Sequence, residues 1–287
     1  IWSGYDRYLW LDAEAEVPQD FDGPVWGRFD FGRTGGGGNS GFESLLFVNG
    51  KPWQAVDTNH QEAPLHARAG ETLRLQLRLW SGLVGGGRPH PNDCKFRMAE
   101  LAVLDEGADS LCYWLTCLLG AYDILDENDP EKKRLLNLAA KAWDLVETAD
   151  PASPAFFDSC ARAVSFLEQE LPPEEKKITV DVVGHTHIDT AWLWRLRHTR
   201  EKCARSFSTV NRLMEEYPEY IFLHTQAQQY DFIRRDYPDI FEQIRRRAAE
   251  GRWEPAGGMW VECDCNLPSG ESIVRQLLYG TRFFEGQ

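Results

Sequence analysis

The sequence predicts three consecutive parts: an N-terminal β-sandwich, an α-helical connector and the beginning of a parallel α/β barrel or sheet. Three observations predict this order. Apolar and polar residues alternate up to about residue 105, apolar residues recur at helical spacing from 107 to 171, and strand-like and helix-like segments alternate from 178 onward. We therefore expect domains at 1–106, 107–177 and 178–287.

The first 106 residues show the period-two alternation of strands that bury one face. Residues 25–31 and 73–79 show this pattern, and residues 42–48 and 98–104 are further candidate strands. Residues 42–48 run into Asn49-Gly50, which is a strong signal for a tight hairpin turn. Several short strands joined by turns are typical of a β-sandwich.

The helical connector is predicted from apolar spacing and from capping residues. Asp129 precedes Pro130, and this pair is typical of a helix start because Asp caps the free N–H groups and Pro fits the first turn. A further helix is expected from about 154 to 170. Residues 171–177 then break the pattern with two prolines and four charges, which indicates a linker.

From residue 178 the pattern changes to alternating strands and helices. The apolar run Ile178–Val183 is predicted to be a buried parallel strand, and further strands are expected at 220–223 and 253–261. Helices are expected between them, over 228–250, and over 269–284. Catalytic groups of such folds lie on the loops that follow the carboxyl ends of the strands.

Composition excludes several classes of partner. The chain has 31 basic and 45 acidic residues, a formal net charge of −14, so it repels nucleic acid and anionic lipid. No apolar run reaches the ~20 residues of a membrane span, and the N-terminus lacks the pattern of a signal peptide. Seven cysteines, an odd number, fit no disulfide framework, which favours free thiols and a cytoplasmic location.

The first chemical motif follows the first strand of the α/β part. It contains His185, His187 and Asp189 within five residues. Neutral imidazole and carboxylate are both good zinc ligands. On an extended or tightly turned segment His187 and Asp189 point the same way, so they can share one ion.

The second motif spans residues 257–272 and also lies between a strand and a helix. Its Asp264 is expected at the same edge as the first motif, where a carboxylate could bind metal, attack a substrate, or do both. Cys263 and Cys265 flank this aspartate and should point away from the site as packing residues. Glu262 is expected to be a solvated carboxylate without a role.

These two motifs carry a resemblance to a known family. Residues 184–194 are similar to the metal-binding strand of glycoside hydrolase family 38 α-mannosidases, and residues 257–264 resemble their nucleophile segment. The stretches 225–230 and 250–255 also resemble that family. Residues 266–276 resemble its cytosolic and bacterial branch, so the chain is identified as an N-terminal fragment of such an enzyme.

The resemblance implies a (β/α)7-type barrel, truncated here, and one Zn²⁺ or a similar divalent ion such as Co²⁺. His187, Asp189 and Asp264 match metal ligands, and Asp264 also matches the nucleophile. Trp192 matches the aromatic residue under the mannose ring, and His185 matches a position that orients ligands by hydrogen bonds. The fourth ligand and the acid/base aspartate of the family are expected beyond residue 287.

The implied reaction is retaining hydrolysis of terminal α-mannosides in oligosaccharides through a glycosyl-enzyme on Asp264. The fragment alone is expected to be inactive, and a second copy of the chain is one candidate to cover its open sheet edge, as a homo-oligomer. Two alternatives remain open at this point. One is a metal-dependent amidohydrolase or sugar deacetylase. The other is a carbohydrate-binding module without catalysis, with Trp26, Trp53 and Trp80 as its platform.

Overall fold

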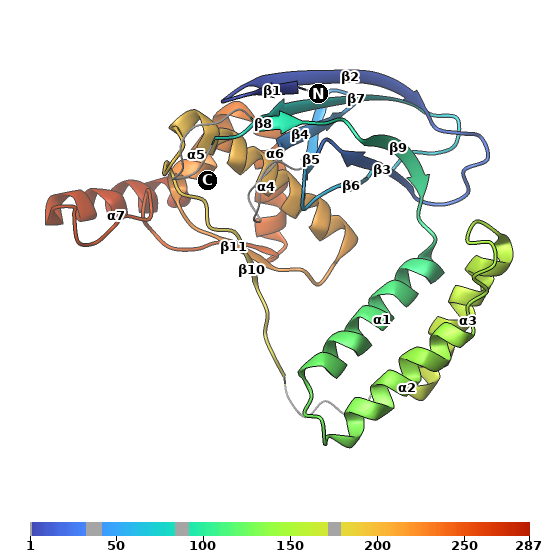
Figure 1. Ribbon diagram of the computed structural model, residues 1–287. Coiled ribbons are helices and arrows are strands. Elements are labelled where there is room, and N and C mark those ends of the chain that lie inside the picture. The colour runs from blue at the N-terminus through green and yellow to red at the C-terminus, as the bar shows by residue number, and fades with distance from the viewer. Residues whose placement is uncertain (1, 33–41, 84–91, 172–178) are drawn as a thin grey trace. The chain divides into compact units, whose positions relative to one another are not determined.

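The computed structural model describes residues 2–32, 42–83, 92–171 and 179–287 (Figure 1). The predicted linker at 171–177 lies, except for its first residue, outside these residues. The contacts divide the chain into two compact units. One comprises residues 1–21, 25–102 and 181–287, and the other comprises 22–24 and 103–180. The division into three domains made from the sequence stays a prediction.

The N-terminal part of the first unit is built from antiparallel sheets. A four-stranded sheet has the order β2-β7-β4-β5, with β2 at Tyr8–Glu16, β7 at Thr72–Trp80, β4 at Glu43–Val48 and β5 at Lys51–Asp57. A three-stranded sheet has the order β6-β3-β9, with β6 at Glu62–Pro64, β3 at Val25–Asp30 and β9 at Met98–Val103. Two short strands, β1 at Trp2–Gly4 and β8 at Asn92–Cys94, form a separate pair.

The apolar and polar residues that alternate in the sequence are alternately buried and more exposed in these strands. Leu73, Leu75, Leu77 and Leu79 of β7 are all buried, and they join residues of β3 and β4 in one apolar core. Asn49 and Gly50 connect β4 to β5 with φ angles of 51° and 79°. Positive φ at both central residues matches the twist of the two strands, so the predicted hairpin turn is confirmed.

The C-terminal part of the first unit contains three parallel strands in the order β10-β11-β12. These are Gly184–His185, Phe222–His224 and Trp253–Pro255. Four helices accompany them: α4 at Leu196–Glu216, α5 at Ala227–Asp236, α6 at Pro238–Ala249 and α7 at Gly270–Glu285. The sequence therefore predicted the βα alternation correctly, whereas the closed barrel stays a prediction.

Two predicted strands are wrong in their extent. Strand β12 ends at Pro255, although a strand was expected over 253–261. Strand β10 is only Gly184–His185, and the apolar residues before it are open to solvent, with Val180 73% and Val182 81% exposed. Such a run is buried only when helices cover both faces of the sheet. The described residues supply no such cover beside this segment, so its apolar character has no packing partner here.

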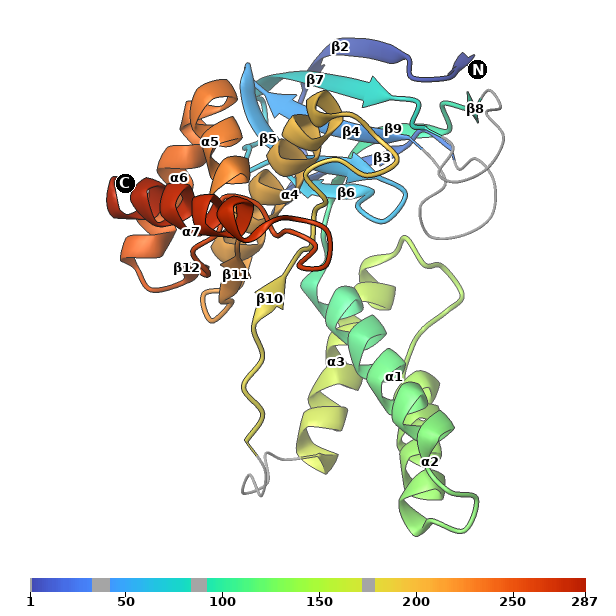
Figure 2. The same ribbon diagram turned by 90° about the vertical axis from the view of Figure 1, so that its left-hand side faces the viewer.

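Helix α4 packs directly on the sandwich (Figure 2). Leu45 of β4 leaves the sandwich core and belongs to the apolar cluster formed by α4, α5, α6 and the parallel sheet. The backbone N–H of Ala55 donates to Thr209 Oγ1 of α4 at 3.0 Å. Lys202 and Arg205 of α4 pair with Glu43 at the start of β4. The sandwich and the parallel sheet therefore share one structural unit.

The second unit contains three helices around their own core: α1 at Glu106–Ile124, α2 at Pro130–Asp144 and α3 at Pro154–Glu170. Asp129 caps α2 by accepting the N–H of Glu131, and Pro130 is the first helical residue. Ser153 caps α3 in the same way. The predicted helix starts are confirmed. None of the described helices has the length and apolar character needed to cross a membrane.

Adjacent leucines of β4 allow a matched test of the contact between α4 and the sandwich. Leu46 is fully buried in the sandwich core, whereas Leu45, 1% exposed, points to α4. We expect Leu45→Ala and Leu46→Ala each to lower the free energy of unfolding by about 2–5 kcal/mol, measured by urea denaturation. The exposed Leu267 provides the control, because Leu267→Ala removes no buried surface. A Leu45→Ala cost as small as that of the control would show that α4 does not dock on β4.

Candidate functional site

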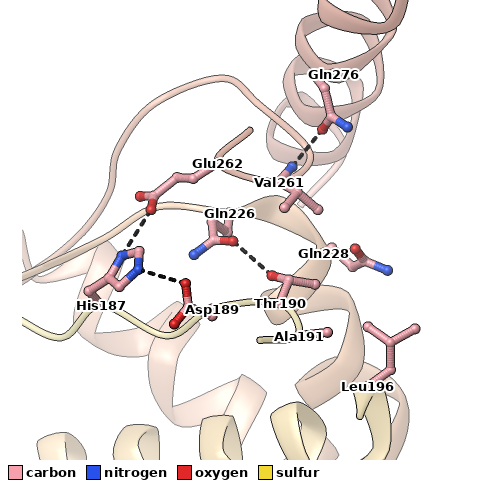
Figure 3. Close-up of a pocket in the computed structure, with 10 residues that line it drawn as sticks. All are labelled: His187, Asp189, Thr190, Ala191, Leu196, Gln226, Gln228, Val261, Glu262 and Gln276. Atoms are coloured by element: carbon pink, nitrogen blue, oxygen red, sulfur yellow. Dashed lines mark hydrogen bonds and ion pairs between the residues drawn. The ribbon is translucent and has the colours of Figure 1, made fainter. Parts of the chain in front are cut away.

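A pocket of about 340 Å³ lies where β10 and β11 end, between the loops that follow them (Figure 3). One side of it carries His187, Asp189 and Glu262. The other side carries amide and apolar groups, including Gln228 and Gln276. The predicted location of the site at the carboxyl ends of the parallel strands agrees with this position.

His187 lies between two carboxylates. Its Nε2 is 3.2 Å from Asp189 Oδ1, and its Nδ1 is 3.1 Å from Glu262 Oε2. Glu262 also accepts a hydrogen bond from Thr225 Oγ1. If Nδ1–H donates to Glu262, Nε2 turns its lone pair towards Asp189. Two electron-rich atoms at this distance are stabilised by a cation or proton shared between them.

The two histidines of the first motif point to different surroundings because they alternate along an extended segment. His185 turns away from the pocket, and its Nδ1 lies 3.0 Å from the carbonyl oxygen of Leu223. Its ring stacks on that of His224 with 6.3 Å between centroids. His185 therefore binds the neighbouring strand, whereas His187 enters the pocket.

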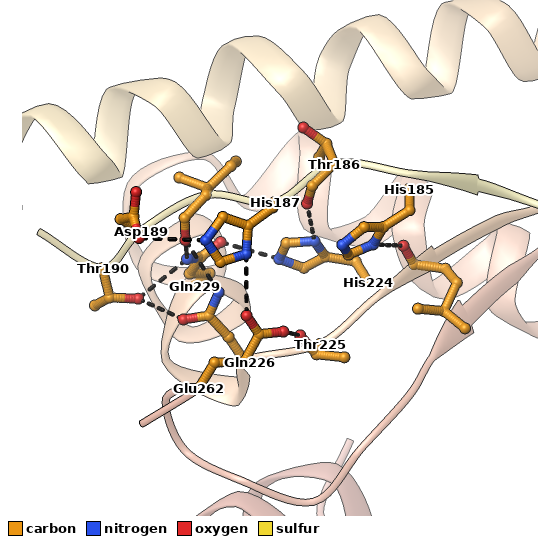
Figure 4. A network of polar contacts seen from close by, with 12 residues as sticks. His185, Thr186, His187, Asp189, Thr190, His224, Thr225, Gln226, Gln229 and Glu262 are labelled. Carbon is orange, nitrogen blue, oxygen red and sulfur yellow. Dashed lines mark hydrogen bonds and ion pairs between the residues drawn. The ribbon is translucent and has the colours of Figure 1, made fainter. Parts of the chain in front are cut away.

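Two glutamines of the β11–α5 connection hold the backbone on either side of Asp189 (Figure 4). Gln226 and Gln229 both donate their Nε2 groups to the carbonyl oxygen of Ile188. Thr190 donates its hydroxyl to Gln226 Oε1 at 2.8 Å and accepts from Gln229 Nε2 at 3.0 Å. Both glutamines are buried, so water does not compete for the hydrogen bonds by which their amides order the loop.

His224 is buried beneath this network, at 0% exposure. Its Nε2 lies 2.9 Å from Gln229 Oε1 and its Nδ1 lies 3.2 Å from the carbonyl oxygen of Thr186. Burial lowers the pKa of His224 to about 4, against a smaller raising effect of these two contacts. The neutral ring has one N–H, which donates to one of the two oxygens.

The loop after Asp189 presents an exposed tryptophan. Trp192 is 63% exposed and meets Trp194 edge to face, with 5.5 Å between ring centroids. Trp194 donates its Nε1–H to Thr199 Oγ1 at 3.0 Å, and Thr199 donates to the carbonyl oxygen of Asp189 at 3.3 Å. The indole of Trp192 therefore stands free while its neighbours attach the loop to α4.

Asp264 is not brought to the other two predicted metal ligands. Its carboxylate accepts the backbone N–H of Asn266 at 2.8 Å, within its own exposed loop. Glu262, two residues earlier, contacts His187 instead. The sequence interpretation assigned Glu262 no role. The alternation that separates His185 from His187 could have drawn attention to it, since a two-residue spacing places Glu262 on the same side as Asp264 wherever a segment is regularly extended.

The donor atoms fit a metal ion in part. Two ligands of one tetrahedral zinc ion, with bonds of about 2.0–2.1 Å, lie roughly 3.3 Å apart, and His187 Nε2 and Asp189 Oδ1 are 3.2 Å apart. Within the described ranges, however, no group of three or more His, Cys, Asp or Glu side chains is arranged to hold an ion. The geometry thus supplies a ligand pair, and a third ligand would have to come from a rearranged loop.

Two of the three tryptophans considered as a sugar platform on the sandwich, Trp80 and Trp53, lie in packed surroundings. Trp80 is buried at 3% exposure, and the ring of His198 stacks on it at 4.6 Å between centroids. Trp53 donates its Nε1–H to the carbonyl oxygen of Pro64, and the guanidinium of Arg212 covers its ring. The structure therefore favours packing roles for both residues.

The buried histidine makes stability depend on pH. A folded-state pKa of about 4 against 6.5 means that the unfolded chain binds the proton first as pH falls. The contribution of neutral His224 is therefore complete above about pH 6.5 and decreases towards pH 4, by up to about 3 kcal/mol. In chelator-treated protein, we expect His224→Gln to flatten the decline of the melting temperature over this range.

His60 provides a control of opposite sign. Its pKa is raised by the hydrogen bond to Asp57, so its contribution is present below the unfolded pKa and decreases as pH rises through the folded one. His60→Gln should change the pH profile in the reverse direction. A profile of His224→Gln parallel to that of the wild-type protein would contradict the assignment.

Comparison with known proteins agrees with this geometry. Residues 177–287 match the family model described as the glycosyl hydrolases family 38 N-terminal domain. Alpha-mannosidase G of Dictyostelium discoideum is 32% identical over 306 residues, covering 99% of this chain and 26% of that protein. Alpha-mannosidase 2C1 of Homo sapiens is 37% identical over 257 residues, covering 84% of this chain and 24% of that protein.

An alpha-mannosidase of Saccharomyces cerevisiae is 40% identical over 132 residues, covering 45% of this chain and 12% of that protein. The chain thus spans about a quarter of the length of the first two relatives. The matched family region begins just before β10 and contains the pocket, the histidine motif and the Asp264 loop. Residues 177–287, which carry the pocket, therefore match the N-terminal domain of glycosyl hydrolase family 38.

Proposed function

We propose that this chain is the N-terminal part of an α-mannosidase that hydrolyses terminal α-mannosides in oligosaccharides with retention of configuration. The observation that carries the proposal is the pair His187 Nε2 and Asp189 Oδ1, 3.2 Å apart in a pocket at the ends of parallel strands. This pair lies inside the region that matches family 38, and the relatives with the highest coverage are named alpha-mannosidases. The competing deacetylase interpretation has no such support.

His187, Asp189 and Asp264 would hold a Zn²⁺ ion or another divalent ion such as Co²⁺. When bound, such an ion supplies a Lewis acid that can bind neighbouring hydroxyl groups of a sugar. Glu262 accepts the Nδ1–H of His187 and so fixes the ring with Nε2 towards Asp189. The glutamine contacts to Ile188 and Thr190 keep the Asp189 carboxylate at the same place.

Asp264 is proposed as the nucleophile. In a retaining glycosidase, one carboxylate attacks the anomeric carbon as the bond to the leaving oxygen breaks, and a second carboxyl about 5 Å away gives that oxygen its proton. Water then releases the sugar. The proposal requires the loop 262–268 to turn the Asp264 carboxylate towards the pocket, away from the N–H of Asn266. The acid/base carboxyl is expected from residues after 287.

Trp192 is proposed to stack under the mannose ring. The indole of Trp192, 63% exposed beside the pocket, has an edge contact with Trp194 and no other ring contact among the described residues. Sugar C–H groups pack well on an indole face. His185, bonded to β11, would keep β10, the strand just before His187, in register.

The rest of the molecule is proposed to complete a (β/α)7-type barrel around this pocket. Helix α7 exposes four large apolar side chains, namely Val274, Leu277, Leu278 and Tyr279. Further barrel elements, or a second copy of the chain in a homo-oligomer, would cover them. A net charge of −14 favours neutral oligosaccharide over nucleic acid or anionic membrane as partner, and a cytoplasmic location fits the free-thiol expectation.

Turnover of an aryl α-mannoside by the full-length protein tests the function. We expect β-anomer product to be absent in the first NMR spectra and chelators to abolish turnover. Asp264→Asn should lower kcat at least about a hundredfold, because one residue serves as nucleophile and ligand. Cys265→Ser, in the same exposed loop, should retain activity. Near-normal turnover of Asp264→Asn, or an inverted product, would remove Asp264 from its proposed role.

The 287-residue chain assayed alone should not turn over an aryl α-mannoside, even with added Zn²⁺ or Co²⁺. It presents a ligand pair and an exposed Asp264, and it is expected to lack the acid/base carboxyl. Weak metal binding, measured by titration calorimetry, should decrease further in His187→Ala. Sustained turnover at the rate of an ordinary enzyme, about 1 s⁻¹ or more, would refute the view that this chain is only part of the catalytic domain.

A further inference from the structure

The ammonium group of Lys202 connects the N-terminal sandwich to the loop of the pocket. Its Nζ lies 2.8 and 2.9 Å from the two carboxylate oxygens of Glu43, at the start of β4. The same Nζ lies 4.8 Å from the centroid of the Trp194 ring and 5.5 Å from that of Trp80. One cation therefore touches a sandwich carboxylate, a sandwich indole and an indole of the pocket loop.

The surroundings make these contacts strong. Burial lowers the pKa of Lys202, and the charge of Glu43 opposes this effect. A partly desolvated ammonium gains more from an aromatic face than an exposed one does. The lysine side chain is only 20% exposed, so its position is set by its neighbours and not by water.

Trp194 passes this constraint to the pocket in two ways. Its edge-to-face contact with Trp192 limits the positions of the exposed indole. Its Nε1–H bond to Thr199, whose hydroxyl donates to the carbonyl oxygen of Asp189, ties the same ring to the backbone of the ligand pair. A displaced Trp194 would therefore move the Trp192 face, whereas the glutamine contacts to Ile188 and Thr190 hold Asp189 without help from Trp194.

We propose that Lys202 is a positioning residue through which the sandwich supports the sugar-stacking face of the pocket. Glu43 neutralises and places the ammonium group, the ammonium group holds Trp194, and Trp194 holds Trp192. This inference rests on the proposed function, since it concerns a sugar stacked on Trp192. It makes the sandwich a working part of the site and not a separate sugar-binding module.

Arg205 offers a matched control. It pairs with the same Glu43 carboxylate and is more deeply buried, with 7% of its side chain exposed against 20% for Lys202, yet among its described contacts it has none with Trp194. Arg205→Met should therefore weaken the attachment of α4 to the sandwich without removing the support of Trp194. Lys202→Met should weaken this attachment and also remove the support of Trp194. The difference between the two variants isolates the contact with the indole.

The test uses the full-length protein and an aryl α-mannoside. Lys202→Met should raise KM by between about twofold and thirtyfold, the range that follows from losing one cation–π contact. The kcat should change little, because stacking holds substrate and transition state alike. Arg205→Met should leave KM within about twofold of wild type, and Lys202→Arg should restore most of the loss, because a guanidinium also stacks on indole.

Trp194→Leu should raise KM as Lys202→Met does, and the two losses should not add in the double variant. Three results would each overturn the inference, given an active wild-type protein. Lys202→Met and Arg205→Met could change KM equally, the effects of Lys202→Met and Trp194→Leu on KM could be additive in free energy, or KM could stay unchanged in Lys202→Met. If Lys202→Met does not fold, an unchanged KM of Trp194→Leu overturns it. An inactive wild-type protein would instead refute the proposed function, and this inference with it.

Discussion

Helix α4 is buried on two sides, and the arrangement of the first unit depends on this constraint. Phe207 and Met214 join the apolar cluster with the parallel strand β11, while Thr209 bonds the backbone of β5 in the sandwich. An ordinary surface helix buries one stripe and leaves the rest to water. Because α4 leaves little of its surface to water, the two β layers on either side of it cannot move independently.

The side of α4 that faces the sandwich buries charged residues. Each buried charge is paired with an opposite charge or a hydrogen-bond donor, which explains the residue types found at that interface. Burial raises the pKa of Glu43, but the charges of Arg205 and Lys202 outweigh this effect and hold it below its ordinary value. Asp6 serves His198 and Trp80 similarly, by accepting a hydrogen bond from each. Removing one partner of such a group leaves the other buried without compensation, so these contacts specify how the layers meet.

The pocket is assembled from loops, and their backbone is correspondingly unusual. Ala191 and Gln226 have φ angles of 144° and 65°, in the region that side chains other than glycine rarely adopt. The hydrogen bonds from Gln226 and Gln229 to Ile188 offset this strain and place Asp189 between two anchored residues. His187 gains its own constraint from Glu262, so the proposed ligand pair His187 and Asp189 is already arranged in the structure.

The sequence by itself determined the local elements, because their signals lie within a few residues. Alternation in β7, the Asn49-Gly50 turn, the cap at Asp129 and the start of α3 near Pro154 all appear as predicted. The proximity of His187 and Asp189 also follows from a two-residue spacing. Each of these depends on backbone geometry that neighbouring residues set without help from the rest of the chain.

Only the tertiary structure decided which distant side chains meet. It joined Glu262 to His187, left Asp264 bonded to its own loop, and exposed Val180 and Val182 of the apolar run before β10. It also placed Glu43 of the sandwich under Lys202 of α4. Such pairs are separated by up to 192 residues, as in Asp6 and His198, and their contact depends on how layers pack. Periodicity and spacing report the burial and direction of a side chain, but not the identity of the partner that it meets.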